Sequence, residues 1–483
     1  MKSEIIVVGG GSAGLLAAIG AARQLTLSEN GGTVTVLEKM PRPGRKIMIT
    51  GKGRCNFTNV KPWQDFSAHI QSDPAAVNPA WHTLTPEGLI DFFRENGLRS
   101  VVERGDRAFP ATMNAGDVVD ALKRACTLNG VKLVTDCEVK TVDVTPRGFS
   151  LDCVQTTRKQ LKFKEEVTIE PVEHSCRKLI IATGGLSYPG TGSTGDGYMW
   201  AEEMGHAIKP CFPSLTALVP AGYKSDNPLA SEIKNAFRGR TVYGKTKERK
   251  IAPLPSWYPK FPKHIERVTP LSEQGALFNG NTLENVQLTL MVNGSPVQTE
   301  FGDIEFTDGG LEGPIGFTVS RRAVKALNDG QKVAVSIDLK PSVELDKLDA
   351  DIHGRWQEII DDPRSKGQSF RRLFRILLGK LIPWDLTLAF LDTNQSVSVD
   401  TLARALKDWN LPIAGFVGFE RSVVTAGGVS TQDVVAKTLE SKKQPGLYFA
   451  GEVLEMDCDK GGYNLQCAFA TGFLAGESAA KAL

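Results

Sequence analysis

The first fifteen residues place a short apolar strand directly before a glycine-rich turn and a helix. The apolar run at 5–8 leads into the pattern Gly-x-Gly-x-x-Gly, whose glycines are Gly9, Gly11 and Gly14. An alanine- and leucine-rich helix follows, and we predict it over Ser12–Leu27. Glycine lets the turn close tightly, brings backbone close to a phosphate and packs helix against strand. A chain that begins this way is constrained to a parallel α/β sheet that binds a dinucleotide.

The residues around this turn predict where the phosphates and the ribose lie. Ser12 and Ala13 open the helix, and the positive end of its dipole favours the charge of a pyrophosphate. A second strand at 33–37 ends at Glu38, an acid placed to accept hydrogen bonds from an adenosine ribose, and Lys39 follows it. A glycine turn in an unrelated α/β protein does not require this strand, helix and acid together.

A basic, glycine-rich loop at 44–56 favours FAD over NAD. Arg45, Lys46 and Arg54 can neutralise phosphate, and Gly53 permits close backbone approach. The alternative interpretation is a solvated basic loop.

Two later strand ends point to the same cofactor. A strand at 178–182 ends in small residues, Thr183 to Gly185, that let the chain pass beside a ligand. Another ends at Gly451 and Glu452, where the carboxylate can accept hydrogen bonds from ribityl hydroxyls. The segment 461–464 then opens a final helix, whose positive end favours negative charge on a reduced flavin ring. Nucleotide-binding segments at both ends of the chain predict a discontinuous domain.

Six stretches together resemble the BaiN-like, or aminoacetone oxidase-like, family of FAD flavoproteins. They are GRKIMITGKGRCNFTN (44–59), GDRAFP (105–110), ATGGLSYPGTGSTGDGY (182–198), FTDGGLEGP (306–314), TAGGVS (425–430) and PGLYFAGEVLEMDCDKGGYNLQCAFATG (445–472). The resemblance implies FAD, a fold core of the two-dinucleotide-binding-domain type, and an inserted, mostly β domain with a helical segment. The candidate cofactor-binding residues are Gly9, Gly11, Ser12, Ala13, Gly14, Glu38, Lys39, Arg45, Lys46, Gly53, Arg54, Cys55, Asn56, Val139, Thr183, Gly184, Gly185, Gly451, Glu452, Gly462, Tyr463, Asn464 and Leu465.

The chain departs from the family pattern at four positions. Asp308 stands where relatives usually have His, and Glu312 where they usually have Ser. Cys467 replaces a common Trp, and Lys52 a third glycine. A substrate contact made by the His or Ser of relatives is therefore not transferable, and we assign no catalytic residue.

The expected fold class is α/β, with a discontinuous Rossmann-like FAD-binding domain at 1–215 and 411–483. We predict an inserted β-rich substrate domain at 216–345, with strands at 286–292, 297–307 and 332–339, and a helical segment at 346–410.

Charge is nearly balanced over the whole chain but not within the insert. The formal net charge is +2, from 57 basic and 55 acidic side chains, whereas 234–267 holds ten Lys or Arg against two Glu. Interleaved aromatics make this stretch a candidate for RNA binding. The other interpretation is a Pro-rich solvated loop.

Other features limit the remaining possibilities. The eight cysteines show no Cys-x-x-Cys spacing, so we expect reduced thiols and no metal site, with Cys55 and Cys458 as packed, unpaired thiols. His206 is expected to be structural. No apolar run approaches the ~18 residues of a membrane helix or the core of a signal peptide, which predicts a cytoplasmic protein without a membrane partner. A second glycine pattern at 190–195 begins well past its strand and is rejected as an NAD(P) site.

These observations predict an FAD-dependent oxidoreductase that transfers hydride between flavin N5 and a small organic substrate. Reduction of an activated C=C bond is the first hypothesis, with NAD(P)H as a transient electron donor. An O2-using amine or aminoketone oxidase, reduction of a uridine in ribosomal RNA, and a flavin-bound redox sensor are the alternatives.

Overall fold

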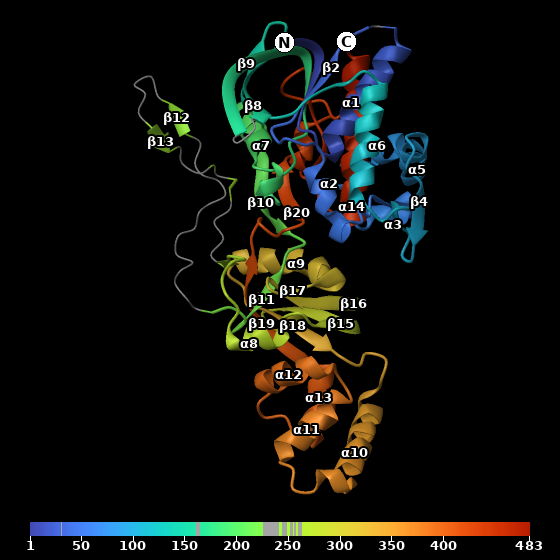
Figure 1. Ribbon diagram of the computed structural model, residues 1–483, viewed down its shortest axis with the longest axis vertical. Coiled ribbons are helices and arrows are strands. Elements are labelled where there is room, and N and C mark those ends of the chain that lie inside the picture. The colour runs from blue at the N-terminus through green and yellow to red at the C-terminus, as the bar shows by residue number, and fades with distance from the viewer. Residues whose placement is uncertain are drawn as a thin grey trace. The chain divides into compact units, whose positions relative to one another are not determined.

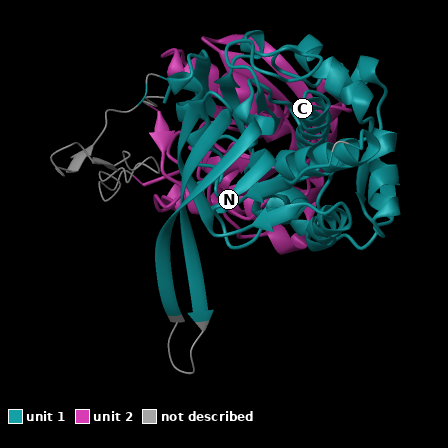
Figure 2. Ribbon diagram, turned by 90° about the horizontal axis from the view of Figure 1, so that it is seen from above, with its two compact units in different colours: residues 1–212, 235–259, 424–483 teal, residues 213–234, 260–423 magenta. Residues whose placement is uncertain are grey.

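The computed structural model describes residues 1–29, 31–160, 165–225, 241–243, 249–251, 255, 257–258 and 263–483. The chain divides into two compact units (Figures 1 and 2). Unit 1 comprises Met1–Phe212, Asn235–Pro259 and Val424–Leu483, and unit 2 comprises Pro213–Lys234 and Lys260–Val423.

Unit 1 is built on a seven-stranded sheet in the order β6-β2-β1-β9-β8-β7, with β21 also paired to β9. The strands β6, β2, β1, β9 and β21 run parallel, whereas β7 and β8 extend the sheet as an antiparallel arm. The hydrogen-bonded order of the parallel strands is that of a dinucleotide-binding fold. These strands are β1 (Lys2–Val8), β2 (Val34–Leu37), β6 (Lys132–Val134), β7 (Cys137–Thr145), β8 (Gly148–Gln160), β9 (Glu165–Ile181) and β21 (Leu447–Phe449).

Two helices of unit 1 pack together because glycines remove the side chains between them. A Cβ on Gly472 of α14 would overlap the backbone of Ala13 in α1, and a Cβ on Gly476 would overlap that of Ala17. The helices of this unit are α1 (Ser12–Leu27), α2 (Arg45–Ile49), α3 (Trp63–Ser67), α4 (Pro74–Thr83), α5 (Pro86–Glu95), α6 (Ala115–Leu128), α7 (Asp196–Glu203) and α14 (Gly461–Lys481).

Smaller sheets complete unit 1. One is three-stranded, in the order β3-β5-β4, and β12 pairs with β13. The strands β10 and β20 pair with each other where the chain leaves and re-enters this unit. Their bounds are β3 (Thr58–Asn59), β4 (Ser100–Glu103), β5 (Arg107–Pro110), β10 (Ile208–Ser214), β12 (Thr241–Tyr243), β13 (Arg249–Ile251) and β20 (Val424–Val429).

Unit 2 contains a closed antiparallel sheet. Its order is β11-β17-β16-β15-β18-β19, and β11 pairs back to β19, so that this path has no free edge, while β14 joins β19 in parallel. The strands are β11 (Leu218–Pro220), β14 (His264–Ile265), β15 (Thr282–Val292), β16 (Ser295–Thr307), β17 (Gly310–Glu312), β18 (Val333–Asp338) and β19 (Trp409–Val417).

An aromatic cluster joins the sheet of unit 2 to its helices. Trp409 of β19 is fully buried, its ring centroid lies 5.6 Å from that of Phe278 and 5.3 Å from that of Phe390, and its indole N–H donates to the Thr393 hydroxyl. These contacts bury a large apolar area while satisfying the polar indole nitrogen. The helices of unit 2 are α8 (Glu273–Phe278), α9 (Gly313–Asn328), α10 (Leu345–Asp361), α11 (Phe370–Gly379), α12 (Thr387–Thr393) and α13 (Val399–Lys407).

The observed elements confirm the expected fold class and the helix over Ser12–Leu27, but the unit boundaries differ from those drawn on the sequence. The chain from Trp409 to Val423 lies in unit 2, because β19 pairs with β18 and β11. The predicted helical segment at 346–410 lies in the same unit as the β-rich stretch. Helix α9, inside that stretch, was not predicted, although Ile315, Val319 and Ala323 repeat at helical spacing on its buried side.

Candidate dinucleotide site

The glycine turn between β1 and α1 has the geometry that its sequence predicts. Gly9 has φ +106°, which L side chains rarely adopt, and a Cβ there would overlap the carbonyl group of Ala182. A Cβ on Gly14 would overlap the Gly9 carbonyl oxygen and lie 3.0 Å from its carbonyl carbon. A Cβ on Gly11 would meet nothing within 4 Å, so the backbone there faces open space. This open backbone can approach a pyrophosphate.

The first turn of α1 leaves its backbone N–H groups available. Gly11 is the N-cap, no side chain among the described residues caps the helix, and its first turn contains no acid. The N–H groups beside Ser12 and Ala13 therefore offer donors and a positive dipole end to a phosphate. A Cβ on Gly451, whose φ is +77°, would lie 2.6 Å from the Ala13 Cβ, which brings the segment carrying Glu452 next to this turn.

Glu38 is held in place by two backbone donors. Its Oε2 accepts from the Gly10 N–H at 2.7 Å and its Oε1 accepts from the Met40 N–H at 2.7 Å. Burial raises the pKa of this carboxyl above its ordinary value, against the effect of the two hydrogen bonds. Because a carboxylate oxygen has more than one acceptor position, the Glu38 carboxylate can still accept ribose hydroxyls.

Lys39 points to the second glycine pattern instead of to the glycine turn. Its Nζ forms an ion pair with Asp196 at 2.6 Å and also donates to the Thr194 hydroxyl. A Cβ on Gly192 would lie 3.0 Å from Met40 Cγ. The loop 190–195 therefore packs beside the residues that follow Glu38.

The basic loop contributes fewer free cations than its sequence suggests. The Lys46 ammonium lies 2.7 Å from a Glu452 carboxylate oxygen. The Arg54 guanidinium lies 4.8 Å from the centroid of the Phe109 ring and 3.7 Å from Glu103. Arg45 is exposed. Arg45 is thus the residue of this group best placed to meet solvent or phosphate.

Backbone conformation explains much of the rest of this loop. Gly51 and Lys52 both have φ +56°, and Gly53 has φ +84° with nothing within 4 Å of its Cβ position. Lys52 thus occupies a left-handed conformation that favours glycine. Cys55 is fully buried, and burial raises the pKa of its thiol to about 11, so only its backbone can face a ligand.

Thr425 ties together two of the predicted segments, and the sequence-based site omitted it. Its backbone N–H donates to Glu452 Oε1 at 2.7 Å. Its hydroxyl oxygen accepts from the N–H groups of Leu186 and Ser187 at 2.8 and 3.0 Å. A Cβ on Gly185 would overlap this side chain. Thr425 therefore holds the loop after Thr183 and Gly184 against the Glu452 carboxylate.

The start of α14 is shaped by small and amide residues. A Cβ on Gly462 would lie 2.7 Å from the Asn56 side chain, whose nitrogen donates to the carbonyls of Thr58 and Ala108. Asn464 accepts from the Cys458 N–H at 2.9 Å and donates to the Cys458 carbonyl at 2.8 Å. Asn464 thus fixes the segment that precedes the helix.

Tyr463 is buried and points away from solvent. Its ring centroid lies 4.1 Å from that of His69 and 4.7 Å from that of Phe66. His69 in turn hydrogen-bonds Asp459 at 2.9 Å. In the described part of the chain no side chain caps α14 and no acid lies in its first turn, so the N–H groups near Gly462 and Leu465 can face an anionic ring.

The structure also gives the positions of Val139, Cys458 and His206 in unit 1. Val139 lies in β7, buried, and the Cys137 N–H nearby donates to the Glu38 carbonyl at 2.9 Å, so this strand begins at the Glu38 end of the site. Cys458 is a buried free thiol, as expected, and its Sγ lies 3.8 Å from the Cys467 Sγ without a disulfide between them. His206 is buried between the Ala201 carbonyl and the Ser441 hydroxyl, as expected of a structural residue.

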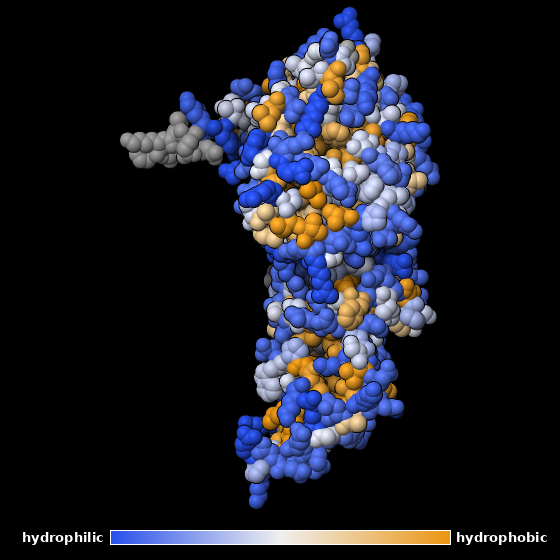
Figure 3. Space-filling model, turned by 90° about the vertical axis from the view of Figure 1, so that its right-hand side faces the viewer, coloured by the Kyte–Doolittle hydropathy of each residue, from blue (hydrophilic) through white to orange (hydrophobic). Residues whose placement is uncertain are grey.

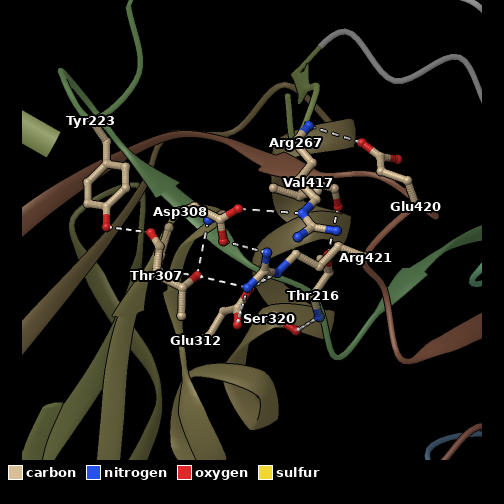
Figure 4. Close-up of polar contacts among 12 residues, drawn as sticks. Thr216, Tyr223, Arg267, Thr307, Asp308, Glu312, Ser320, Val417, Glu420 and Arg421 are labelled. Carbon is tan, nitrogen blue, oxygen red and sulfur yellow. Dashed lines mark hydrogen bonds and ion pairs between the residues drawn. The ribbon is translucent and has the colours of Figure 1, made fainter. Parts of the chain in front are cut away.

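A charged cluster in unit 2 centres on Arg421 (Figure 4). Its guanidinium donates to Asp308 at 2.6 Å and to both oxygens of Glu312, which is 6% exposed. Arg267 lies 3.5 Å from Asp308, and the Tyr223 hydroxyl donates to the Thr307 carbonyl at 2.7 Å. The two acids that depart from the family pattern are therefore both bound to one arginine.

Two further predictions concern the basic stretch of the insert and the absence of membrane helices. Most of the basic stretch 234–267 lies outside the described residues. The face in Figure 3 is mainly hydrophilic, with apolar residues in separate patches. No helix in the described ranges is long and apolar enough to span a membrane.

The residues present fit FAD. The glycine turn leaves open space at Gly11, the first turns of α1 and α14 carry unused donors, and Glu38 and Glu452 are fixed by backbone N–H groups. These are the donor and acceptor positions that a pyrophosphate, a flavin ring and two sugar chains require.

Comparisons with known proteins identify the family of the chain. The family model described as HI0933-like protein Rossmann domain matches residues 3–478. A 3-dehydro-bile acid delta(4,6)-reductase from Clostridium scindens is 28% identical, covering 99% of both chains. A ribosomal RNA dihydrouridine synthase from Escherichia coli is 27% identical, covering 98% of this chain and 96% of the relative. A solved 3-ketosteroid delta1-dehydrogenase from Sterolibacterium denitrificans aligns over 100% of both chains with 13% identity and a TM-score of 0.48. The chain belongs to the HI0933-like, or BaiN-like, family of FAD-dependent oxidoreductases.

Proposed function

We propose that this protein reduces a carbon–carbon double bond conjugated to a carbonyl group in a ring-shaped organic substrate. The observation that carries the proposal is the whole-length similarity to two relatives whose names both describe hydrogen addition to a ring. One name specifies a 3-dehydro bile acid with Δ4,6 unsaturation, and the other specifies dihydrouridine. The shared chemistry is an activated C=C bond that accepts hydride.

FAD, when bound, supplies the hydride for such a reduction. The chain's own residues then have four tasks. The turn at Gly9–Gly14 and the start of α1 hold the phosphates, Glu38 orients the adenosine, and Glu452 fixes the opposite end of the cofactor chain through its bond to Thr425. The start of α14 would offer backbone N–H groups to a flavin ring and so favour the negative charge of its reduced form. The roles of all these residues toward FAD are part of this proposal.

The test is anaerobic stopped-flow reaction of the purified, FAD-loaded protein. The flavin is first reduced with NADH or NADPH, which also tests the proposed electron donor. The reduced protein is then mixed with a Δ4-3-ketosteroid acid or, as a matched control, with its saturated 3-keto counterpart. We expect reoxidation by the enone alone, with a product two mass units heavier. Flavin reduction by aminoketones followed by peroxide release, with enones inert, would contradict the proposal and favour an oxidase.

A second candidate function is uridine reduction in ribosomal RNA. It is favoured by the relative named as a ribosomal RNA dihydrouridine synthase and by the basic stretch 234–267. RNA binding through this stretch predicts a steep decrease of affinity with salt, lessened when Lys245, Lys247, Arg249 and Lys250 are replaced by Gln. Incubation of the reduced protein with unmodified ribosomal RNA, followed by nucleoside mass spectrometry, distinguishes this activity from reduction of a free enone. Absence of both RNA binding at low salt and dihydrouridine would exclude it.

A further inference from the structure

Three side chains of the antiparallel arm converge in the interior of unit 1 although they lie far apart in sequence. Cys137 is in β7, Cys153 in β8 and His174 in β9, and their ligand atoms all lie within 4.8 Å of one another. Cys137 Sγ lies 3.8 Å from His174 Nε2. The three residues are 1%, 2% and 6% exposed.

Strand pairing explains why they meet. Val139 is opposite Cys153, and Cys137 lies two residues before Val139, so both thiols are on one face of the arm. Leu151 is opposite His174 and lies two residues before Cys153, which places the imidazole on the same face. The register of three adjacent strands thus fixes the cluster, and no side chain has to leave its strand to form it.

We propose that Cys137, Cys153 and His174 form a binding site for a zinc ion. Zinc takes thiolate and imidazole ligands at about 2.3 and 2.0–2.1 Å, so tetrahedral ligands lie roughly 3.5–3.8 Å apart. The distance between Cys137 Sγ and His174 Nε2 is already in this range. No fourth His, Cys, Asp or Glu joins the group within the described residues, which leaves one coordination position to water.

The imidazole of the cluster makes a direct polar contact with one of its thiols, between His174 Nε2 and Cys137 Sγ. The Nδ1 of His174 is buried and finds no hydrogen-bond partner among the described residues, so this ring makes its polar contact through its Nε2, to the Cys137 thiol.

The site would brace the start of the arm next to the proposed adenosine position. The Cys137 N–H donates to the Glu38 carbonyl at 2.9 Å, so a metal that fixes Cys137 also restrains the backbone of Glu38. All three protein ligands are buried in the antiparallel arm, which favours a structural role for the metal. The proposal is independent of the reaction that the protein catalyses.

The test measures zinc bound by the purified FAD-loaded protein after equilibration with zinc and removal of the excess. We expect about one zinc per chain with a dissociation constant below about 1 μM. Cys137→Ser and Cys153→Ser should each weaken zinc binding by more than about 100-fold. Loss of a residue that only hydrogen-bonds a metal ligand typically weakens metal binding by about 10–100-fold. Cys126→Ser, which removes a buried thiol of α6 outside the cluster, should retain the metal.

Two measurements on the unmodified chain keep the proposal testable even if a variant fails to fold. Cobalt substitution should give thiolate-to-cobalt charge transfer and the visible bands of a tetrahedral site, seen as a difference spectrum against the metal-free FAD-loaded protein. Zinc should also slow amide exchange in β7, β8 and β9. Failure of the wild-type protein to take up zinc, or retention of zinc by a folded Cys137→Ser, Cys153→Ser double variant, would overturn it.

Discussion

Substituting two glycines of the same turn by alanine separates close packing from cofactor contact. At Gly14 a Cβ would overlap the Gly9 carbonyl oxygen, so the turn and α1 must move apart. Overpacking of this kind costs about 1–3 kcal/mol. Alanine regains roughly 1 kcal/mol over glycine inside a helix. Because the overlap is with backbone, the cost lies at the upper end of this range, and we expect Gly14→Ala to lower the free energy of unfolding of the FAD-free protein by about 2 kcal/mol.

The same movement displaces the phosphate donors. A hydrogen bond to a charged group contributes about 1.5–3 kcal/mol, so losing even one weakens FAD binding by roughly 10–150-fold. Gly11→Ala is the matched variant, because its Cβ meets nothing within 4 Å and its φ of −82° suits any residue. Its cost to the FAD-free protein is at most about 1 kcal/mol, from the weaker N-cap. Its FAD affinity should nevertheless fall as far as that of Gly14→Ala, since the new methyl group enters the space assigned to pyrophosphate.

Urea unfolding of the FAD-free proteins and quenching of flavin fluorescence on titration give the two quantities. The expected pattern is a larger loss of stability in Gly14→Ala than in Gly11→Ala, and a loss of affinity in both. A Gly11→Ala protein that binds FAD like wild type would refute the placement of the pyrophosphate over this backbone. A Gly14→Ala protein of wild-type stability and affinity would refute the packing argument.

Three further predictions concern residues outside this turn. Arg421→Gln leaves the buried Glu312 carboxylate without its arginine and should lower the free energy of unfolding of unit 2 by about 3–5 kcal/mol in urea. The double variant Arg421→Gln, Glu312→Gln should lose much less stability. Equal losses of stability in the two variants would contradict the pairing. Burial lowers the pKa of the His206 imidazole below its ordinary 6.5. As the pH falls, this imidazole is therefore protonated in the unfolded chain before it is protonated in the folded chain. Stability should therefore be full above about pH 6.5 and fall below it, and His206→Gln should flatten this decrease in unfolding experiments; an unchanged pH profile counts against it. Lys52→Gly should raise the melting temperature, because it removes about 1–2 kcal/mol of left-handed backbone strain, partly offset by the conformational entropy of glycine in the unfolded chain. A melting temperature below that of the wild type would show that contacts of the Lys52 side chain stabilise the protein by more than this strain costs.

Features that depend on neighbouring residues were predictable from the sequence, whereas those made by tertiary contacts were not. The glycine turn follows from three positions within six residues, and the structure gives Gly9 and Gly14 the close contacts that were expected. Thr425 lies in TAGGVS (425–430), one of the stretches that carry the family resemblance. However, its hydrogen bonds to Glu452 and to the backbone after Gly185 join segments more than 25 residues apart. No local pattern distinguishes such a threonine from one on a strand surface.

The same limit applies to the cysteines. Spacing rules detect ligands that a short turn brings together, and the eight cysteines have no such spacing. Cys137, Cys153 and His174 meet only because β7, β8 and β9 pair in one register. Lys46 and Glu452 show a related effect, since two side chains expected to face the cofactor form an ion pair with each other.

The departures at Asp308 and Glu312 are best understood as one change and not two. A glutamate that is 6% exposed requires a partner, and Arg421 supplies it while also binding Asp308. A Glu312→Ser variant would leave Arg421 paired with Asp308 of these two acids, and an Asp308→His variant would leave Arg421 paired with Glu312. Either single change would leave the Arg421 guanidinium in place beside the remaining acid. Asp308 and Glu312 therefore belong to one ion-paired cluster, and a change at either position acts through Arg421.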